Sequence, residues 1–429
     1  MFRTTHSRAL AAIAAGGLAA AGLVATIGGS AQAGVTGTNS SGVTTTAALG
    51  SNWYAAAPYL MPLDNNPPNP TDVMAATGLK AFQLAFVLAP NGGGCSPTWG
   101  GTAPVSSDTA VASTIDSIRA AGGDVSVSIG GYGGTKLGQT CGTPAATAAA
   151  YQQVIDKYSL HAIDFDLEEP EYENTAAVAN EIGAAQILQQ NNPGLYVSVT
   201  TPGTAAGTGW FGQQMLNQAK TDGFTPNNFS IMPFDGGFSG AASQISALQA
   251  FNTLLMNTFG WSSATAYAHE GISMMNGRSD SGEYFYQSDF QSVLNFATSN
   301  GLARYTNWSV NRDRQCTPPD NNGQTSGTCS SVTQQPWDFT KFSVQFAGAT
   351  PPTTPPTTTP PTGGTGGGTG GGTGGGTGGS CTAAPWTSGV AYNGGAVVSY
   401  NGHQWTAKWW TENDIPGGPA GVWTDNGAC

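Results

Sequence analysis

The chain has 429 residues, which is too long for one small domain and indicates two or more folded units. Only 9% of the residues are charged, and 13 Lys and Arg against 25 Asp and Glu give a formal net charge of −12. A chain with so few cations is poorly suited to neutralising phosphate groups, so we exclude nucleic acid and an anionic membrane as partners. A neutral ligand fits this composition better.

Residues 1–33 have the features of a secretory signal peptide. Arg3 and Arg8 form a basic start, residues 9–27 are an apolar run, and Ala31-Gln32-Ala33 supplies a small-residue cleavage pattern. A transmembrane anchor is the alternative, but Gly and Ala dilute the run and the cleavage pattern follows it directly. We therefore expect a secreted, extracellular protein.

Export makes the number of cysteines informative. An even number in an oxidising compartment indicates disulfides. The domain layout favours the pairings Cys95–Cys141, Cys316–Cys329 and Cys381–Cys429. No CxxC motif or Cys/His cluster has zinc spacing, so we expect no metal and no cofactor.

A low-complexity segment divides the chain. Residues 351–380 are rich first in Pro and Thr and then in Gly and Thr, which is typical of a linker that cannot form a packed core. The sequence predicts a loose Thr/Ser-rich tail at 34–50, a large body at 51–347, a linker at 348–380 and a small C-terminal unit at 381–429.

Apolar strand patterns alternate with helical patterns along the body. Eight strands are expected at 53–61, 81–89, 125–130, 162–168, 195–201, 229–234, 266–275 and 304–310. Helical stretches between them include 108–121, 145–158, 175–190, 210–221 and 286–299. This order predicts an α/β fold, and its length suits a (β/α)8 TIM barrel with its chemistry at the carboxyl ends of the strands. A doubly wound sheet is the alternative, but no GxGxxG follows the first strand.

The fourth predicted strand carries three acidic residues at alternate positions. Since strand side chains alternate between two faces, Asp164, Asp166 and Glu168 share one face and point into the barrel. Crowded carboxyl groups cannot all ionise easily, so at least one pKa is expected to be raised. An acid that stays protonated near neutral pH can protonate a leaving oxygen. A cation site or an acidic barrel rim is the alternative from the pattern alone.

Four motifs in chain order resemble glycoside hydrolase family 18, the family of chitinases and endo-β-N-acetylglucosaminidases. DFDLE at 164–168 resembles the DxDxE signature, and SIGG at 128–131 resembles the SxGG motif. MPFD at 232–235 resembles MxYD, and Trp308 lies where the family has a tryptophan at the cleavage subsite. The resemblance covers about residues 53–346 and implies the same barrel fold.

The resemblance also implies roles for the three acids. Glu168 would act as general acid and then as general base. Asp166 would orient the substrate's acetamido group, whose carbonyl oxygen attacks the anomeric carbon to form an oxazolinium ion with retention of configuration. Asp164 would lie behind Asp166 and share a proton with it.

The remaining site residues follow from the other two motifs. Asp235 and Met232 would line the cleavage subsite, and Trp308 would offer an apolar plane to a sugar ring. An ordinary core tryptophan is the alternative for Trp308.

Two departures from the family pattern stand out. His161-Ala162 replaces the family's Asp-Gly at the start of the fourth strand, where a structural effect is expected. Phe234 replaces a tyrosine whose hydroxyl would hold the acetamido carbonyl. Either another donor, such as Tyr132 or Tyr305, takes its place or turnover suffers.

The C-terminal unit is too small to bury a self-sufficient core, so we expect a β-type module stapled by Cys381 and Cys429. Its rings outnumber those that such a core could hide, and its sequence resembles carbohydrate-binding modules of families 5 and 12, including Ala-Lys-Trp-Trp at 407–410. Trp409 and Trp410 are the expected sugar-binding residues.

Together these features predict a secreted, monomeric chitinase whose partners are chitin and chitin oligosaccharides. An endo-β-N-acetylglucosaminidase acting on N-glycans would share every catalytic residue, although a module for an insoluble polymer would help it little. A non-catalytic chitin-binding lectin is the alternative from another class, because of Phe234.

Overall fold

The computed structural model describes residues 37–349 and, near the C-terminus, residues 383–387, 391–392, 396–408, 411–412, 414–417 and 422–428. The chain divides near residue 357 into two compact units, which are described separately. The predicted signal peptide and most of the predicted linker lie outside the described residues. Within the described part, no helix is both long and apolar enough to cross a membrane.

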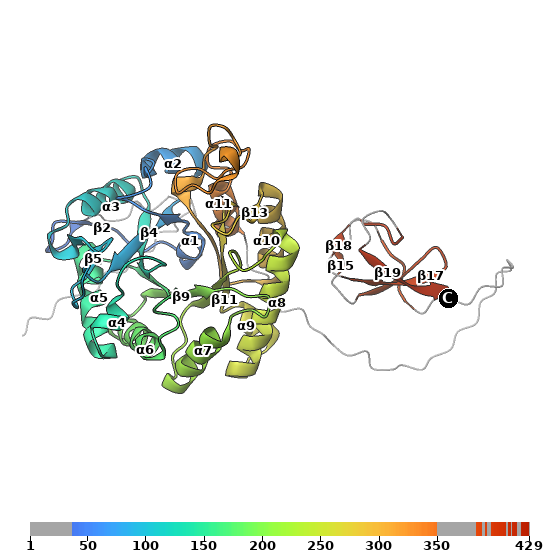
Figure 1. Ribbon diagram of the computed structural model, residues 1–429, viewed down its shortest axis with the longest axis horizontal. Helices are drawn as coiled ribbons and strands as arrows, with labels where there is room; N and C mark the ends of the chain where they lie inside the picture. The colour runs from blue at the N-terminus through green and yellow to red at the C-terminus, as the bar shows by residue number, and fades with distance from the viewer. Residues whose placement is uncertain are drawn as a thin grey trace, which may run out of the picture. The chain divides into compact units, whose positions relative to one another are not determined.

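Eight parallel strands form the centre of the large unit (Figure 1). In chain order they are β3 (Tyr59–Leu60), β4 (Ala81–Leu88), β7 (Asp124–Gly130), β8 (Ala162–Asp166), β9 (Tyr196–Pro202), β10 (Asn228–Met232), β11 (Glu270–Met275) and β14 (Arg304–Trp308). Parallel ladders join each strand to the next from β3 to β14. Side chains link β14 back to β3, because the Thr306 hydroxyl donates to the Ala57 carbonyl at 2.5 Å and the Tyr59 and Trp308 rings lie 5.7 Å apart. The predicted (β/α)8 barrel is confirmed.

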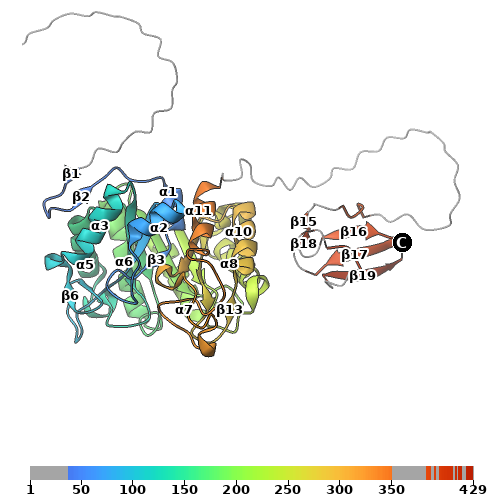
Figure 2. The ribbon, with the colours of Figure 1, turned by 90° about the horizontal axis from the view of Figure 1, so that it is seen from above.

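Helices surround the strands, as Figures 1 and 2 show. The longer ones are α2 (Pro70–Thr77), α3 (Ala110–Ala120), α5 (Pro144–Tyr158), α6 (Thr175–Asn191), α7 (Trp210–Asp222), α8 (Gly240–Phe259), α10 (Gln287–Asn300) and α11 (Thr340–Gly348). The shorter ones are α1 (Ser51–Ala56), α4 (Leu137–Thr140) and α9 (Ser263–Tyr267), with 3-10 turns η1 (Val105–Ser107), η2 (Val310–Arg312) and η3 (Asn321–Gly323). Short hairpin strands decorate the barrel at β5 (Thr98–Trp99), β6 (Ala103–Pro104), β12 (Gly277–Arg278) and β13 (Tyr284–Phe285).

Local sequence explains where several helices begin and end. Helix α5 begins at Pro144, directly after Thr143, whose hydroxyl accepts the Ala146 N–H at 3.2 Å. Helices α8 and α10 end at Gly260 and Gly301, both in the left-handed conformation that glycine adopts without strain.

The structure differs from the sequence prediction at the first strand. Residues 53–56 belong to helix α1, and only Tyr59–Leu60 pair as a strand. The helix lets the Tyr54 hydroxyl reach Asp124 Oδ2 at the start of β7, at 2.6 Å. Likewise, the predicted seventh strand begins at Glu270, because residues 263–267 form α9. The 20-residue helix α8 was not among the helical stretches predicted.

The segment predicted as a loose tail is docked from residue 37 onward. Strands β1 (Gly37–Thr38) and β2 (Thr44–Thr45) pair with each other. The Thr44 N–H donates to Asp116 Oδ1 of α3 at 2.6 Å, and Val43 is buried in the barrel's core. One buried valine and polar contacts to the barrel hold this segment, and its Thr/Ser-rich composition does not predict them.

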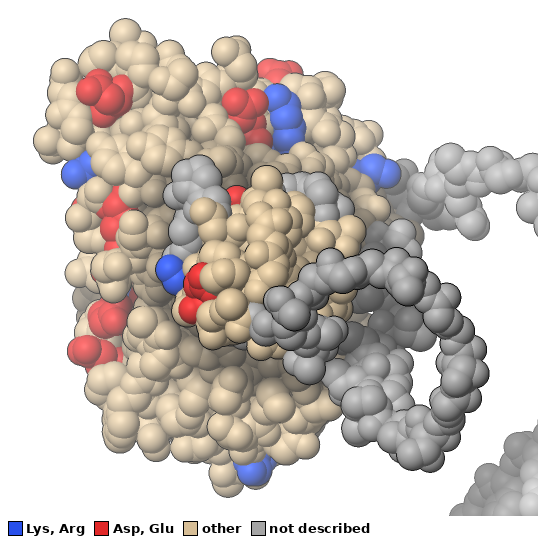
Figure 3. All heavy atoms as spheres, turned by 90° about the vertical axis from the view of Figure 1, so that its right-hand side faces the viewer, with Lys and Arg blue, Asp and Glu red and all other residues tan. Residues whose placement is uncertain are grey.

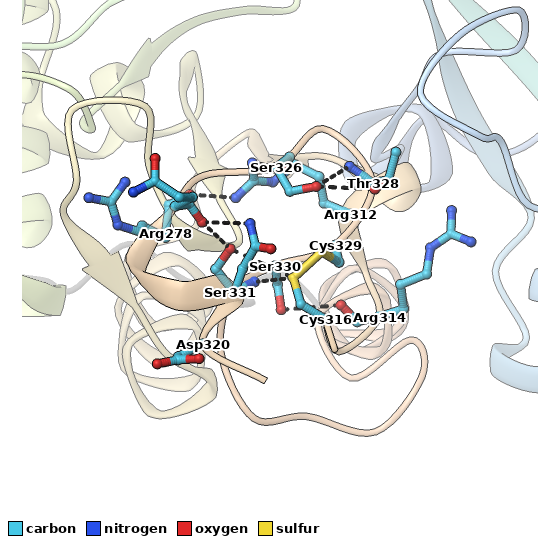
Figure 4. Close-up of a disulfide and its surroundings, with 12 residues drawn as sticks. Arg278, Arg312, Arg314, Cys316, Asp320, Ser326, Thr328, Cys329, Ser330 and Ser331 are labelled. Carbon is cyan, nitrogen blue, oxygen red and sulfur yellow. Dashed lines mark hydrogen bonds between the residues drawn. A yellow bond between two sulfur atoms is a disulfide. The ribbon is translucent and has the colours of Figure 1, made fainter. Parts of the chain in front are cut away.

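Two disulfides fasten loops of the barrel, and both match the predicted pairings. They are Cys95–Cys141 and Cys316–Cys329. The second closes a loop that follows β14, and the Arg312 guanidinium donates to the Ser326 carbonyl within that loop at 2.6 Å (Figure 4).

The C-terminal unit is a small antiparallel β structure, as predicted. Strands β16 (Val397–Tyr400), β17 (His403–Ala407) and β19 (Trp423–Ala428) form one sheet, and β15 (Ala391–Tyr392) pairs with β18 (Thr411–Glu412). Its core contains Val398, Ala407, Val422 and Trp423, against which Trp386, Tyr392 and Trp405 pack. Several rings that were expected to exceed the core therefore help to build it. Trp409, Trp410, Cys381 and Cys429 lie outside the described residues.

Candidate active site

The site is built on β8, whose residues alternate as predicted. Asp164 and Asp166 are 0% and 2% exposed and point into the barrel, while Ile163 and Phe165 pack in the apolar core on the other face. The strand ends at Asp166, so Glu168 lies two residues beyond it in the following loop and is half-buried. The three acids thus lie in sequence from the barrel interior toward the carboxyl ends of the strands.

Asp164 is surrounded by hydrogen-bond donors from five other strands. One oxygen, Oδ2, accepts from Tyr59 Oη (3.0 Å), Gln83 Nε2 (2.9 Å) and Ser128 Oγ (2.8 Å). The other, Oδ1, accepts from Ser198 Oγ (2.6 Å) and Thr200 Oγ1 (2.9 Å) and pairs with Arg304 Nη1 (3.1 Å). Both oxygens are engaged by donors other than Asp166, so the sharing of a proton between Asp164 and Asp166 stays a prediction.

Asp166 has the opposite environment. Its Oδ1 atom is buried and has no hydrogen-bond partner among the described residues. Burial raises the pKa of Asp166 well above its usual range, and the charges of Glu168 and Asp164 add to this effect. The buried site therefore favours the protonated form of Asp166.

Glu168 is poised to exchange a proton. Burial raises its pKa to about 7, and the charge of Glu169 adds to the rise, whereas the Lys136 ammonium opposes it. The charges of Asp235 and Asp280 raise this pKa further. A carboxyl group with this pKa can both give and take a proton near neutral pH.

The two glycines of SIGG let β7 end close against β8. Gly130 has φ +98°, and a Cβ there would collide with the Asp166 carbonyl oxygen. The next residue, Gly131, donates its N–H to that carbonyl at 2.8 Å, and a Cβ on it would meet the Phe86 ring. The motif therefore fixes the backbone of Asp166, while Ser128 binds Asp164.

Trp308 closes β14 at the same end of the barrel as Glu168. Its ring stacks on Phe86 with centroids 5.5 Å apart and planes 9° apart, and it tilts against Tyr59. It is partly exposed, whereas the residues before it on β14 are buried. Its place agrees with an apolar platform for a sugar ring, a role that stays a prediction.

Met232 is the last residue of β10 and is buried, whereas Asp235 is exposed and has φ +56°. Asp235 Oδ1 accepts both the N–H and the hydroxyl of Ser281, at 2.6 and 2.8 Å. The hairpin that contains Ser281 thus orients Asp235, whose charge acts on Glu168.

The two donors suggested to replace the missing tyrosine hydroxyl differ in the structure. The Tyr305 side chain is buried outside the barrel interior and its hydroxyl donates to the Phe290 carbonyl at 2.9 Å, so that suggestion is wrong. Tyr132 is 72% exposed in the loop after β7 and stays a candidate. His161, at the start of β8, has Nδ1 2.8 Å from Asp124 Oδ2, which agrees with a structural role.

The sequence analysis missed a second buried group of ionisable residues beside the site. Lys136, Glu171 and Glu181 are all at most 1% exposed. Lys136 lies in a glycine-rich loop, and the two glutamates lie on either side of the start of a helix. No local sequence pattern predicts that these residues come close together in the fold.

The fold and the site are of the kind found in barrel glycoside hydrolases that act through carboxyl groups. Residues 385–424 match a family model, carbohydrate-binding module family 5/12. The barrel region is 28% identical over 285 residues to the "Probable bifunctional chitinase/lysozyme" of Escherichia coli (strain K12), covering 61% of this chain and 31% of that protein. It is 27% identical over 285 residues to Endochitinase 11 of Metarhizium anisopliae, covering 61% of this chain and 52% of that protein.

A solved structure, the catalytic domain of a hyperthermophilic chitinase from Pyrococcus furiosus, superposes with a TM-score of 0.61 at 24% identity. The match covers 68% of this chain and 94% of that one, and it shows the barrel fold. The chain thus spans about a third and about half of the lengths of the two curated relatives. The resemblance to chitinases and to carbohydrate-binding modules of families 5 and 12 is confirmed.

Proposed function

We propose that this chain is a secreted chitinase that hydrolyses the β-1,4 linkages between N-acetylglucosamine units of chitin. The observation that carries the proposal is Glu168, an acid with a pKa of about 7 at the carboxyl ends of the barrel strands. Chitinases among the relatives and the family 5/12 match at the C-terminus support chitin as the substrate.

The proposed first step uses the substrate's own acetamido group. Protonated Glu168 donates its proton to the glycosidic oxygen while that oxygen leaves the anomeric carbon. The acetamido carbonyl oxygen bonds to the same carbon and forms an oxazolinium ion. Asp166, at the end of β8 and two residues before Glu168, would orient the acetamido group.

The second step reverses the role of Glu168. As a carboxylate it takes a proton from water, and the water oxygen attacks the anomeric carbon and opens the oxazolinium ring. The acetamido group is restored and the product keeps its β configuration. A pKa of about 7 serves both steps, because neither protonation state of Glu168 is costly to reach near neutral pH.

Measuring reducing-sugar release from chitin hexamer tests the proposal. Cellulose hexamer and fully deacetylated chitosan are the controls, since neither carries the acetamido nucleophile, and we expect cleavage of chitin hexamer alone. Binding of chitin hexamer without any release would instead support a lectin. Release of N-glycans without cleavage of chitin hexamer would support an endo-β-N-acetylglucosaminidase.

A further inference from the structure

One carboxylate joins the β12–β13 hairpin to the loop that follows β10. It belongs to Glu283, a half-buried residue of the turn between the two hairpin strands. Glu283 Oε2 accepts the Asp235 N–H at 2.6 Å, and Oε1 accepts the Phe238 N–H at 2.6 Å. In the described part of the chain, no other side chain hydrogen-bonds to the backbone of residues 235–238.

The backbone of residues 235–238 has little intrinsic preference for the shape it adopts. Asp235 has φ +56° and Gly237 has φ +83°, with Gly236 between them. A left-handed backbone costs free energy in a residue with a side chain, and glycines widen the range of conformations open to a loop. The two hydrogen bonds to Glu283 therefore select one conformation of this loop.

Asp235 binds the same hairpin with its own side chain. Since its Oδ1 atom accepts both the N–H and the hydroxyl of Ser281, the hairpin fixes the side chain of Asp235 as well as its main chain. The other oxygen, Oδ2, accepts no hydrogen bond from the described residues, and Asp235 is exposed. Asp235 thus offers one free oxygen beyond the carboxyl end of β10, in a direction set by the hairpin.

The hairpin that carries Glu283 is itself fixed to the rest of the barrel. The Arg312 guanidinium donates to the Arg278 carbonyl of the hairpin at 2.5 Å and to the Ser326 carbonyl of the disulfide-closed loop at 2.6 Å (Figure 4). Within the hairpin, the Ser279 hydroxyl donates to Glu283 Oε2 at 3.2 Å. Glu283 therefore holds residues 235–238 against a rigid support.

We propose that Glu283 is a positioning residue that directs the free Oδ2 oxygen of Asp235 toward the bound sugar. This inference rests on the proposed function and on the expected place of Asp235 in the cleavage subsite. A carboxylate oxygen suits N-acetylglucosamine, whose hydroxyl groups and amide N–H are hydrogen-bond donors. Glu283 touches no substrate and acts only through residues 235–238.

The test compares Glu283→Gln with wild type in the kinetics of chitin hexamer hydrolysis. Glutamine keeps the size of the side chain, but its amide nitrogen cannot accept an N–H, so one of the two hydrogen bonds to the loop is lost. Asp235 then loses its fixed direction, and we expect KM to rise about tenfold while kcat changes by less than about twofold.

Asp289→Asn is the matched control, because Asp289 joins the start of α8 to the end of the hairpin in a similar way. Its two oxygens accept the Ala241 N–H at 3.0 Å and the Tyr286 N–H at 2.8 Å, and neither donor belongs to residues 235–238. This variant should lower the free energy of unfolding as Glu283→Gln does, but it should leave KM unchanged.

A double-mutant cycle shows whether Glu283 acts through Asp235. Asp235→Ala alone should raise KM by at least about tenfold, and adding Glu283→Gln to it should change KM by less than about twofold, because no oxygen is left to direct. A further tenfold rise in the Asp235→Ala background would overturn the inference, and so would a wild-type KM in Asp235→Ala or in folded Glu283→Gln.

Glu283→Ala covers the case in which Glu283→Gln does not fold, since alanine places no donor against the two N–H groups. It should raise KM when Asp235 is present and leave KM unchanged when Asp235 is replaced by alanine. A wild-type KM in folded Glu283→Ala would likewise overturn the inference. Absence of hydrolysis by the wild type would instead overturn the proposed function.

Discussion

The acidic series at residues 164–168 shows how carboxyl groups two residues apart acquire different roles. Asp164 accepts five hydrogen bonds and pairs with Arg304, all of them fully inside the barrel. Toward the open end of the barrel, Asp166 Oδ1 has no hydrogen-bond partner in the part of the chain that the structure describes, and Glu168 has a pKa of about 7. Because its hydrogen bonds are complete, the Asp164 carboxylate is part of the scaffold. Asp166 and Glu168 have fewer partners and are the reactive groups.

The largest effect expected from this contrast is on catalysis. Glu168→Gln keeps the shape of the side chain but cannot give up a proton, so chitin hexamer hydrolysis should fall by at least about 100-fold. Hexamer binding, measured by calorimetry, should change little. Retention of more than about a hundredth of the wild-type rate would contradict the assignment of Glu168.

The contrast also predicts a large loss of stability when Asp164 is replaced and a small one when Asp166 is replaced. Asp164→Ala leaves the Arg304 guanidinium buried without its partner and should lower the free energy of unfolding by about 3–5 kcal/mol, measured in urea. Asp166→Asn removes no hydrogen bond that the described residues make to Oδ1, so it should change the free energy of unfolding by less than about 1 kcal/mol while abolishing activity. Asp156→Ala, on the exposed face of α5, is the control. Equal losses for Asp164→Ala and Asp166→Asn would contradict the contrast.

The acidic residues at the end of β8 could be predicted from the sequence, whereas the hydrogen-bond donors that hold Asp164 could not. Alternation along residues 162–168 is a local property, so it places Asp164 and Asp166 on one face without knowledge of the rest of the chain. The donors of Asp164 come from five other strands, and its ion-pair partner Arg304 lies in the last strand of the barrel, far away in the chain. Such contacts exist only after the barrel closes.

Helix α1 and the docked segment at 37–50 show a second limit. An apolar run such as 53–61 fits a strand or a buried helix equally well. The helix is supported by contacts distant in the chain, such as that of Tyr54 with Asp124, which the local pattern does not contain. The segment at 37–50 is anchored by the buried side chain of Val43 and by polar contacts such as that of the Thr44 N–H with Asp116, which a Thr/Ser-rich composition does not predict. The small number of charged residues is evident from the composition. On the face drawn in Figure 3, charged side chains accordingly lie scattered among uncharged ones.

The buried pair of Glu171 and Glu181 should make stability depend on pH. Burial raises the pKa of Glu181 from 4.5 to about 7, so the folded state binds more protons than the unfolded state between these values. Stability from this group is therefore full below about pH 4.5 and is lost as the pH rises to about 7. Glu181→Gln should remove roughly 2–3 kcal/mol of that decline.

Urea unfolding at a series of pH values measures this effect. Glu173→Gln, at an exposed position of the same loop as Glu171, is the matched control and should keep the wild-type decline. A Glu181→Gln protein whose stability falls with pH as steeply as that of wild type would contradict the raised pKa of Glu181.

The smallest effect concerns the C-terminal unit and depends on the substrate. A chain ending at Thr350 should lose about tenfold in rate on insoluble chitin, because the module no longer raises the local concentration of the barrel at the surface. Its rate on soluble chitin hexamer should be unchanged. An equal loss on both substrates would mean that the module is part of the active cleft.

The configuration of the first product tests the substrate-assisted mechanism most directly. Proton NMR at early times of chitin hexamer hydrolysis distinguishes the two anomers before they equilibrate. Attack by the acetamido group followed by water predicts that the β-anomer is released first. Initial release of the α-anomer would contradict the mechanism and the roles given to Glu168 and Asp166.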